Sequence, residues 1–216
     1  AGSAGEPGYA DGKGATARFR APHDVAADSK GNVYVADTGN HLVRKISAEG
    51  VVSTLAGQME IKGNVPSGGY ADGKGLAARF SGPRGVALDK NNNVCVADTD
   101  NAVIRRIAPD GVVTTLAGKA GQTGNVGGKG SAARFNYPQS LDFAPDGSLY
   151  VADIWNRAVR KVSRDGDVET VAALSGKVIS PRGVALDKAG NLAVSDTELQ
   201  TVSLLTPAGA LAALAG

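Results

Sequence analysis

Four copies of one unit make up most of this sequence, and they constrain the fold more than any other feature does. The first two copies align without a gap, from Pro22 ("PHDVAADSKGNVYVADTGNHLVRKI") and from Pro83 ("PRGVALDKNNNVCVADTDNAVIRRI"). Two more begin at Pro138 and Pro181, and the copies close on similar stretches such as "VVSTLAG" and "VVTTLAG". A unit repeated at this length indicates one supersecondary structure that packs against its neighbours.

The pattern inside each copy is that of short strands. Apolar residues alternate with other residues, as at Val25 and Ala27 or at Val86 and Leu88, and a period of two indicates a strand with one buried face. Gly-Asn, Asn-Asn or Asp-Gly turns separate the segments. Four antiparallel strands per copy predict an all-β propeller with four four-stranded blades, in one domain over residues 1–216. The expected blades span residues 19–57, 80–118, 135–173 and 178–216.

The order of motifs in each copy resembles the NHL repeat. A proline is followed by "GVALD", "GN", "VYVADTGNH" and "VRKI", and the Asn-His-Leu triplet that names the family stands at Asn40, His41 and Leu42. The resemblance covers almost the whole chain. It implies a β-propeller, in this family usually of six blades, with the turn after the second strand and the connection before the first strand on one face. The long connections resemble those of a subgroup found in bacterial and plant multidomain proteins.

Two departures from the family pattern concern the number and quality of the copies. Only four copies are present, and the last has Leu199 and Ser203 where the first has Asn40 and Arg44. The opening Ala-Gly also aligns with the Ala-Gly that closes the first copy. We therefore expect a truncated or engineered fragment of a longer propeller, whose open blade faces lead to a homo-oligomer. A designed fragment with no ligand at all would show symmetric self-assembly alone.

The connections between copies carry a second repeated motif, "GYADGKGATARF" from Gly8 and "GYADGKGLAARF" from Gly69. Its glycines permit a tight turn, and its Phe can fill the gap between blades. We expect a self-supporting lid in which Asp11 and Asp72 pair with Arg18 and Arg79. The third copy keeps Arg134 and Phe135 without the Asp. Calcium on the Asp carboxylates is the alternative, and phosphate cradling is disfavoured because the Gly-Lys-Gly lacks the P-loop spacing.

Composition excludes some functions. The formal net charge of +2, from 23 basic and 21 acidic residues, does not indicate a nucleic acid or anionic membrane as partner. Cys95, the single cysteine, lies between valines and reads as a buried hydrophobe. No apolar run approaches the roughly 20 residues of a membrane span. A soluble protein is expected, and nothing distinguishes a secreted or periplasmic location from a cytoplasmic one.

The residues with catalytic chemistry are few. His23 and His41 are the only histidines, so the zinc site of NHL-like amidating lyases cannot be assembled, and no Gly-x-Ser-x-Gly motif is present. The repeated aspartates would lie on one face, but each opens a turn and can bind its N–H groups. We therefore expect no enzyme activity and no cofactor. The aspartates concerned are Asp37, Asp98, Asp153 and Asp196.

Residues that break the repeat symmetry are better candidates for binding. Trp155 is the only tryptophan and lies in a turn two residues before Arg157, a combination typical of an interaction anchor. We predict a non-enzymatic scaffold that binds a protein or peptide through its loop face. The alternatives are a propeller lyase or lactonase whose calcium site needs blades absent here, and an RNA-binding NHL domain. The predicted binding residues are His23, Arg84, Gln139, Trp155, Arg157 and Arg182.

Overall fold

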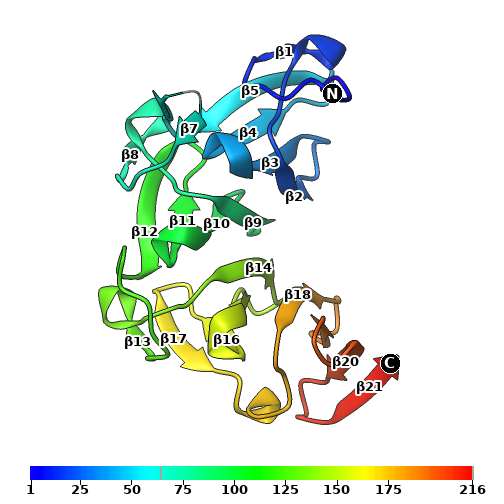
Figure 1. The fold of residues 1–216 in the computed structure, drawn as a ribbon. Coiled ribbons are helices and arrows are strands. Elements are labelled where there is room, and N and C mark those ends of the chain that lie inside the picture. The colour runs from blue at the N-terminus through cyan, green and yellow to red at the C-terminus, as the bar shows by residue number, and fades with distance from the viewer. Residues whose placement is uncertain (64, 216) are drawn as a thin grey trace. The chain divides into compact units, whose positions relative to one another are not determined.

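The computed structural model of the chain describes residues 1–63 and 65–215 (Figure 1). It contains two compact units. Unit 1 comprises Ala1–Asn101 and Arg105–Thr115, and unit 2 comprises Ala102–Ile104 and Leu116–Gly216. Every sheet is antiparallel, which confirms the all-β prediction. The predicted last residue of the fourth blade, Gly216, lies outside the described residues.

The first sheet, in unit 1, is built from the first copy of the repeat. Its strands β2 (Pro22–Ala27), β3 (Val33–Asp37), β4 (Leu42–Ile46) and β5 (Val51–Ala56) pair in sequence order. A two-residue strand of the preceding connection, β1 (Gly12–Lys13), adds to the outer edge of β5. The prediction of four strands is therefore incomplete, because the lid itself contributes a fifth.

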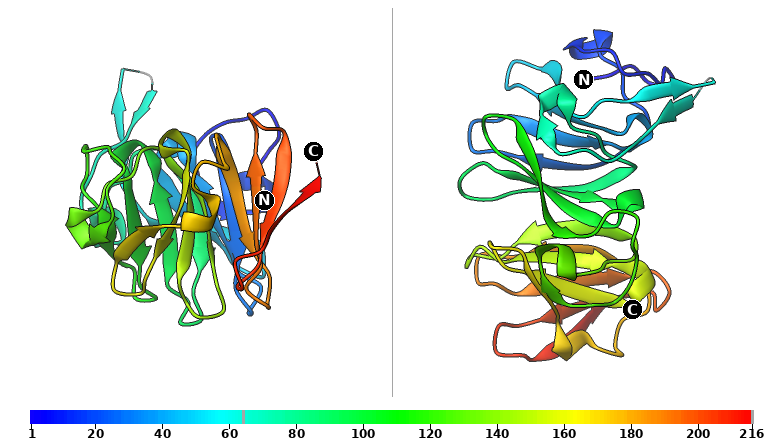
Figure 2. Two further views of the ribbon diagram at one scale, coloured as in Figure 1. Left: turned by 90° about the horizontal axis from the view of Figure 1, so that it is seen from below. Right: turned by 90° about the vertical axis from the view of Figure 1, so that its left-hand side faces the viewer.

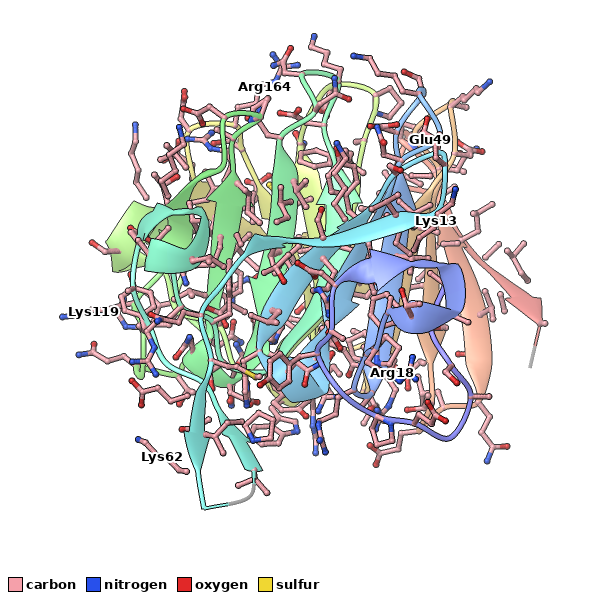
Figure 3. All side chains as sticks on the ribbon, turned by 90° about the horizontal axis from the view of Figure 1, so that it is seen from above. Lys13, Arg18, Glu49, Lys62, Lys119 and Arg164 are labelled. Carbon is pink, nitrogen blue, oxygen red and sulfur yellow. The ribbon has the colours of Figure 1, made fainter. Side chains whose placement is uncertain are left out.

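The second sheet repeats this plan. It has the order β8 (Gly73–Lys74), β12 (Val112–Gly118), β11 (Val103–Ile107), β10 (Val94–Asp98) and β9 (Pro83–Leu88). The long second connection also forms a separate hairpin of β6 (Glu60–Lys62) and β7 (Val65–Ser67). Figure 2 shows this hairpin, in cyan, extending away from the sheets of its unit, and Lys62 is labelled on it in Figure 3.

Unit 2 contains the third and fourth sheets. The third has the order β13 (Gly128–Lys129), β17 (Asp167–Thr170), β16 (Ala158–Val162), β15 (Leu149–Asp153) and β14 (Pro138–Phe143). The fourth has only four strands, β18 (Pro181–Leu186), β19 (Leu192–Asp196), β20 (Thr201–Leu205) and β21 (Leu211–Ala215). Its connection forms a short 3-10 helix, η7 (Ala172–Leu174), in place of the added strand.

Small aliphatic side chains form the core between consecutive sheets. In unit 1, Ala36 and Val43 pack in one buried cluster with Val86 and Val94. Phe80 of the second lid is fully buried in the same cluster, as expected for a residue that fills the gap between blades. A matching cluster in unit 2 joins the third and fourth sheets. None of the described helices is long and apolar enough to cross a membrane.

Candidate functional site

The aspartate after the second strand of each repeat lies in a buried hydrogen-bond network. In the first sheet, Asp37 is fully buried and its Oδ1 accepts the Arg20 N–H at 2.8 Å. Its Oδ2 accepts the Asn40 side-chain amide at 2.8 Å and the Arg44 guanidinium at 2.9 Å. The Asn40 amide also donates to the Gly8 carbonyl at 2.6 Å. The Asp, Asn and Arg therefore join the turn to the connection that precedes the sheet.

The buried arginine holds the lid in place. Nη2 of Arg44 donates to the Ala10 carbonyl at 3.1 Å and to Oδ1 of Asp11 at 2.6 Å. The guanidinium carbon lies 5.2 Å from the centre of the Phe19 ring, a cation–π contact. The predicted pairing of Asp11 with Arg18 is wrong, because Arg18 (labelled in Figure 3) pairs with Glu6.

The second copy reproduces the arrangement. Nη1 of Arg105 donates to Asp98 at 2.9 Å and Nη2 to Asp72 at 2.7 Å, and the guanidinium lies 5.0 Å from the Phe80 ring centre. The predicted pairing of Asp72 with Arg79 is also wrong, because Arg79 pairs with Glu60 at 2.8 Å. Arg105, which belongs to the repeat itself, binds Asp72 in place of the lid residue Arg79, because its ion pair with Asp98 already holds it nearby.

The third copy keeps the network without a lid aspartate, whose place is taken by Gly127. Nη1 of Arg160 donates to Asp153 at 3.2 Å and to the Asn125 side chain at 3.0 Å, and Nη2 donates to the Val126 carbonyl at 3.0 Å. The amide oxygen of Asn125 thus takes the place of the lid carboxylate, whereas the bond to the Val126 carbonyl matches the one that Arg44 makes to the Ala10 carbonyl in the first copy. The lid geometry does not require its aspartate.

Burial governs the ionisation of these aspartates. It raises the pKa of Asp98 to about 6, although the Arg105 charge and several hydrogen bonds favour the carboxylate. Burial also raises the pKa of Asp153 to about 6, although hydrogen bonds from the Asn136 N–H and the Asn156 side-chain amide favour the carboxylate. In the fourth sheet burial again raises the pKa of Asp196, but bonds from the N–H groups of Leu199, Ile179 and others outweigh it, so the pKa is lowered.

These contacts leave the aspartates a structural role. The lid carboxylate of Asp11 is bound by Arg44 and by the Thr54 N–H and hydroxyl, which gives no support to calcium at this position. Within residues 1–63 and 65–215, no three His, Cys, Asp or Glu side chains gather as a metal site. The network joins each turn to its lid.

The predicted binding residues fall into two sets. In unit 1, His23 on β2 is exposed and Arg84 on β9 is half-buried, and the two strands pack against each other. In unit 2, Arg182 is exposed and its Nε donates to the Thr197 hydroxyl at 3.0 Å. Gln139 is only 6% exposed, so its side chain offers little surface to a partner.

The most exposed feature among them is an aromatic pair. Trp155 lies in the 3-10 turn η6 (Ile154–Asn156) and is 64% exposed. Its ring stacks on that of Tyr137, with 4.5 Å between ring centres and 13° between planes. Arg157, two residues further along this turn, is also exposed. We call Tyr137, Trp155 and Arg157 the aromatic site.

Tyr137 is the residue that sequence reasoning missed. It directly precedes Pro138, and its backbone is left-handed with φ of 64°, a conformation disfavoured for a bulky side chain. The signal was present in the repeat alignment, because the equivalent residues of the first two copies are the small Ala21 and Gly82. The Trp155 N–H donates to the Asn136 carbonyl at 3.1 Å, so turn and connection meet on one face, as the family resemblance implied.

Comparisons with known proteins agree with this architecture. The NHL repeat family model matches residues 19–46 and 80–106. The chain is 33% identical over 161 residues to NHL repeat-containing protein 2 of Bos taurus, covering 71% of this chain and 22% of that protein. It is 32% identical over 163 residues to Teneurin-3 of Danio rerio, covering 67% of this chain and 6% of that protein. It therefore spans less than a quarter of either relative.

A solved structure supports the fold. The chain is similar to virginiamycin B lyase from Staphylococcus aureus, with a TM-score of 0.53 and 16% identity. The match covers 90% of this chain and 69% of the lyase. At this identity the likeness concerns the propeller-like arrangement of antiparallel sheets alone.

Proposed function

We propose that this chain, which belongs to the NHL-repeat β-propeller family, is a four-bladed, non-enzymatic module that binds a protein or peptide at the aromatic site. The observation that carries the proposal is the stacked and exposed pair of Tyr137 and Trp155. Large rigid rings that remain in contact with water are typical anchors of protein interfaces. Each of the other three repeats lacks such a pair.

The rest of the repeat supports a binding role over catalysis. The buried carboxylates are used by arginine and asparagine side chains or by backbone N–H groups. The two histidines differ in their surroundings, since His23 is exposed and the ring of His41 accepts the Gly82 N–H at 2.9 Å. A general base needs a free acceptor atom, and the buried carboxylates and Nδ1 of His41 already accept hydrogen bonds, which favours a surface that recognises without reacting.

The test is selection from a random peptide library displayed on phage, with the chain immobilised. Peptides recovered by the parent chain are then assayed against Trp155→Ala. We expect the substitution to weaken their binding by about tenfold or more, as for a central aromatic anchor. Tyr9→Ala is the matched control, because Tyr9 is also an exposed aromatic residue, at 56%, but lies on the first lid. Recovery of peptides that ignore Trp155 would overturn the proposal.

Self-association is a second proposal, and exposed apolar residues on the fourth sheet favour it. Val202 on β20 is 36% exposed and Leu214 on β21 is 57% exposed. Within each unit, consecutive sheets pack against each other through apolar side chains. Val202 and Leu214 offer a second chain a contact of the same kind. Light scattering over a concentration range measures the solution mass directly. A mass that stays near 21.7 kDa at all concentrations argues against association, whereas growth with concentration supports it.

A further inference from the structure

We infer that the aromatic site binds an extended acidic peptide, laying a proline ring on the open face of Trp155 and a carboxylate against Arg157. This inference rests on the proposed function and specifies its partner. Three observations lead to it: the asymmetry between the repeats, the exposure of the Trp155 ring, and the exposed arginine, Arg157, two residues after it in the sequence.

The asymmetry concerns one pair of positions, namely the residue before the proline and the middle residue of the 3-10 turn. In the first copy a Cβ on Gly39 would lie 2.6 Å from Cγ of Arg20, so that turn has no room for a side chain. In the second copy a Cβ on Gly82 would collide with the Asp100 carboxylate. Only the third copy has two rings. The four pairs are Ala21 and Gly39, Gly82 and Asp100, Tyr137 and Trp155, and Ser180 and Glu198.

The tyrosine of this pair keeps a strained backbone. Its φ of 64° suits glycine, which the second copy has at the same position with φ of 56°. A bulky residue in this conformation marks a place where the side chain does something that glycine cannot. Here the ring supports one face of Trp155 and leaves the rest of the exposed indole available to a partner.

The site favours an extended segment over an enclosed small molecule. Trp155 lies at the tip of a turn, and the two cavities described in unit 2, of about 400 and 310 Å³, are lined by other residues. Three backbone donors at the turn are already used, since the N–H groups of Ile154, Trp155 and Arg157 donate to the carbonyls of Tyr137, Asn136 and Ile154. Recognition by added β-pairing to these donors is therefore excluded.

Side-chain recognition of a polyproline II segment fits these constraints. Such a segment needs no backbone N–H donors from its receptor, is already ordered before binding, and packs its proline rings on exposed aromatic faces. Charge then selects the flanking residues. Arg157 is exposed two residues after Trp155, and a positive charge in this turn disfavours a lysine or arginine as a cation–π partner of Trp155 and favours a glutamate or aspartate.

The experiment uses Trp155 as its own reporter, because it is the only tryptophan of the chain. Intrinsic fluorescence is titrated with a capped peptide of repeated Glu-Pro-Pro triplets. Matched peptides carry Lys in place of Glu, or Ala in place of Pro. Oligouridylate, a single-stranded RNA, is titrated in the same way to test the alternative that this site binds RNA. We expect saturable binding of the Glu-Pro-Pro peptide, weakened about threefold for the Lys peptide, as for exposed ion pairs, and more for the Ala peptide.

A charge variant separates the two contacts. Arg157→Gln should remove the preference for Glu over Lys and the salt dependence, whereas Arg157→Lys should keep both. Equal binding of the Glu and Lys peptides by the parent chain, or a response to oligouridylate with none to peptide, would overturn the inference. Phage selection that recovers Trp155-dependent peptides without proline or acidic residues would also overturn it, yet leave the proposed function standing. Failure to recover any Trp155-dependent peptide would overturn both.

Discussion

Arg105 and Asp98 form an ion pair of 2.9 Å in which both side chains are fully buried. The same arginine reaches Asp72 of the lid at 2.7 Å. One guanidinium thus connects the turn after β10 with the lid before β9. Because a buried charge is stable only when its partners are in place, the pair couples the folding of the lid to that of the sheet.

Arg105→Ala is expected to lower the free energy of unfolding by about 3–5 kcal/mol, because it leaves the Asp98 carboxylate buried without its cation. Urea denaturation followed by circular dichroism measures the change. Ser203→Ala is the matched control, since Ser203 occupies the same repeat position in the fourth sheet, where Asp196 is bound by backbone N–H groups. Equal effects of the two substitutions would show that the arginine is dispensable.

Asp72→Asn is expected to have a much smaller effect, about 1 kcal/mol or less. The Asp72 side chain is 46% exposed, and partly exposed ion pairs contribute little. In the third lid, Gly127 stands at the position of Asp72, and Arg160 binds the side chain of Asn125. The buried arginine therefore binds a lid that lacks this carboxylate. Hydrogen exchange of the Thr115 amide, which donates to Asp72 at 3.2 Å, should nevertheless become faster. In Asp72→Ala, which removes the acceptor altogether, unchanged exchange would contradict the assigned hydrogen bond.

The sequence predicted the sheets far better than the side-chain pairings. The period of two and the turn residues fix the strands locally, so β2, β3, β4 and β5 appear where expected. The partner of Asp11 depends on which arginine reaches it across 33 residues, and local spacing favoured Arg18. The strand pairing of the lid, between β1 and β5, is likewise a long-range contact that no local pattern specifies.

Of the two rings in the candidate site, the sequence predicted Trp155 and not Tyr137, because the contact between them is long-range. Trp155 stands out as the only tryptophan in a turn. Its stacking on Tyr137, 18 positions earlier in the numbering, follows from the meeting of the turn with the connection. Comparing the residue before each proline across the copies would have found Tyr137, because its equivalents are Ala21, Gly82 and Ser180.

Stability should fall as pH rises from about 4 to about 6. Burial raises the pKa of Asp98 and Asp153 from 3.8 to about 6, so the folded chain holds more protons than the unfolded chain in this interval. Their favourable contribution is present below pH 4 and is lost as pH rises through 6. Asp196, whose pKa is lowered, acts oppositely: its contribution is present above about pH 4 and is lost as pH falls further.

Urea denaturation at a series of pH values between 4 and 7 measures this slope. Asp153→Asn removes one of the two titrations and should reduce it. Asp165→Asn, in an exposed turn, makes the same change of charge and serves as the control. A free energy of unfolding that is independent of pH over this range, or that rises, would contradict the raised pKa values.

Tyr137→Gly should separate stability from binding. Glycine relieves the positive φ, a gain of about 1–2 kcal/mol, while the lost stacking costs about 0.5–1.5 kcal/mol, so the free energy of unfolding should stay within about 1.5 kcal/mol of the parent. Binding of Trp155-dependent peptides should nonetheless weaken, because the indole loses its support. Tyr137→Ala, which keeps the strain and loses the ring, should be less stable than Tyr137→Gly.

Ala21→Gly is the control for the backbone contribution. Ala21 has φ of 46° at the equivalent position of the first copy and has no ring to lose, so this substitution should stabilise the chain by about 1 kcal/mol and leave peptide binding unchanged. Unfolding and peptide titration are measured on all three variants. If Tyr137→Gly lowered the free energy of unfolding by several kcal/mol, the ring would be core packing. Unaltered peptide binding by that variant would instead remove the tyrosine from the aromatic site.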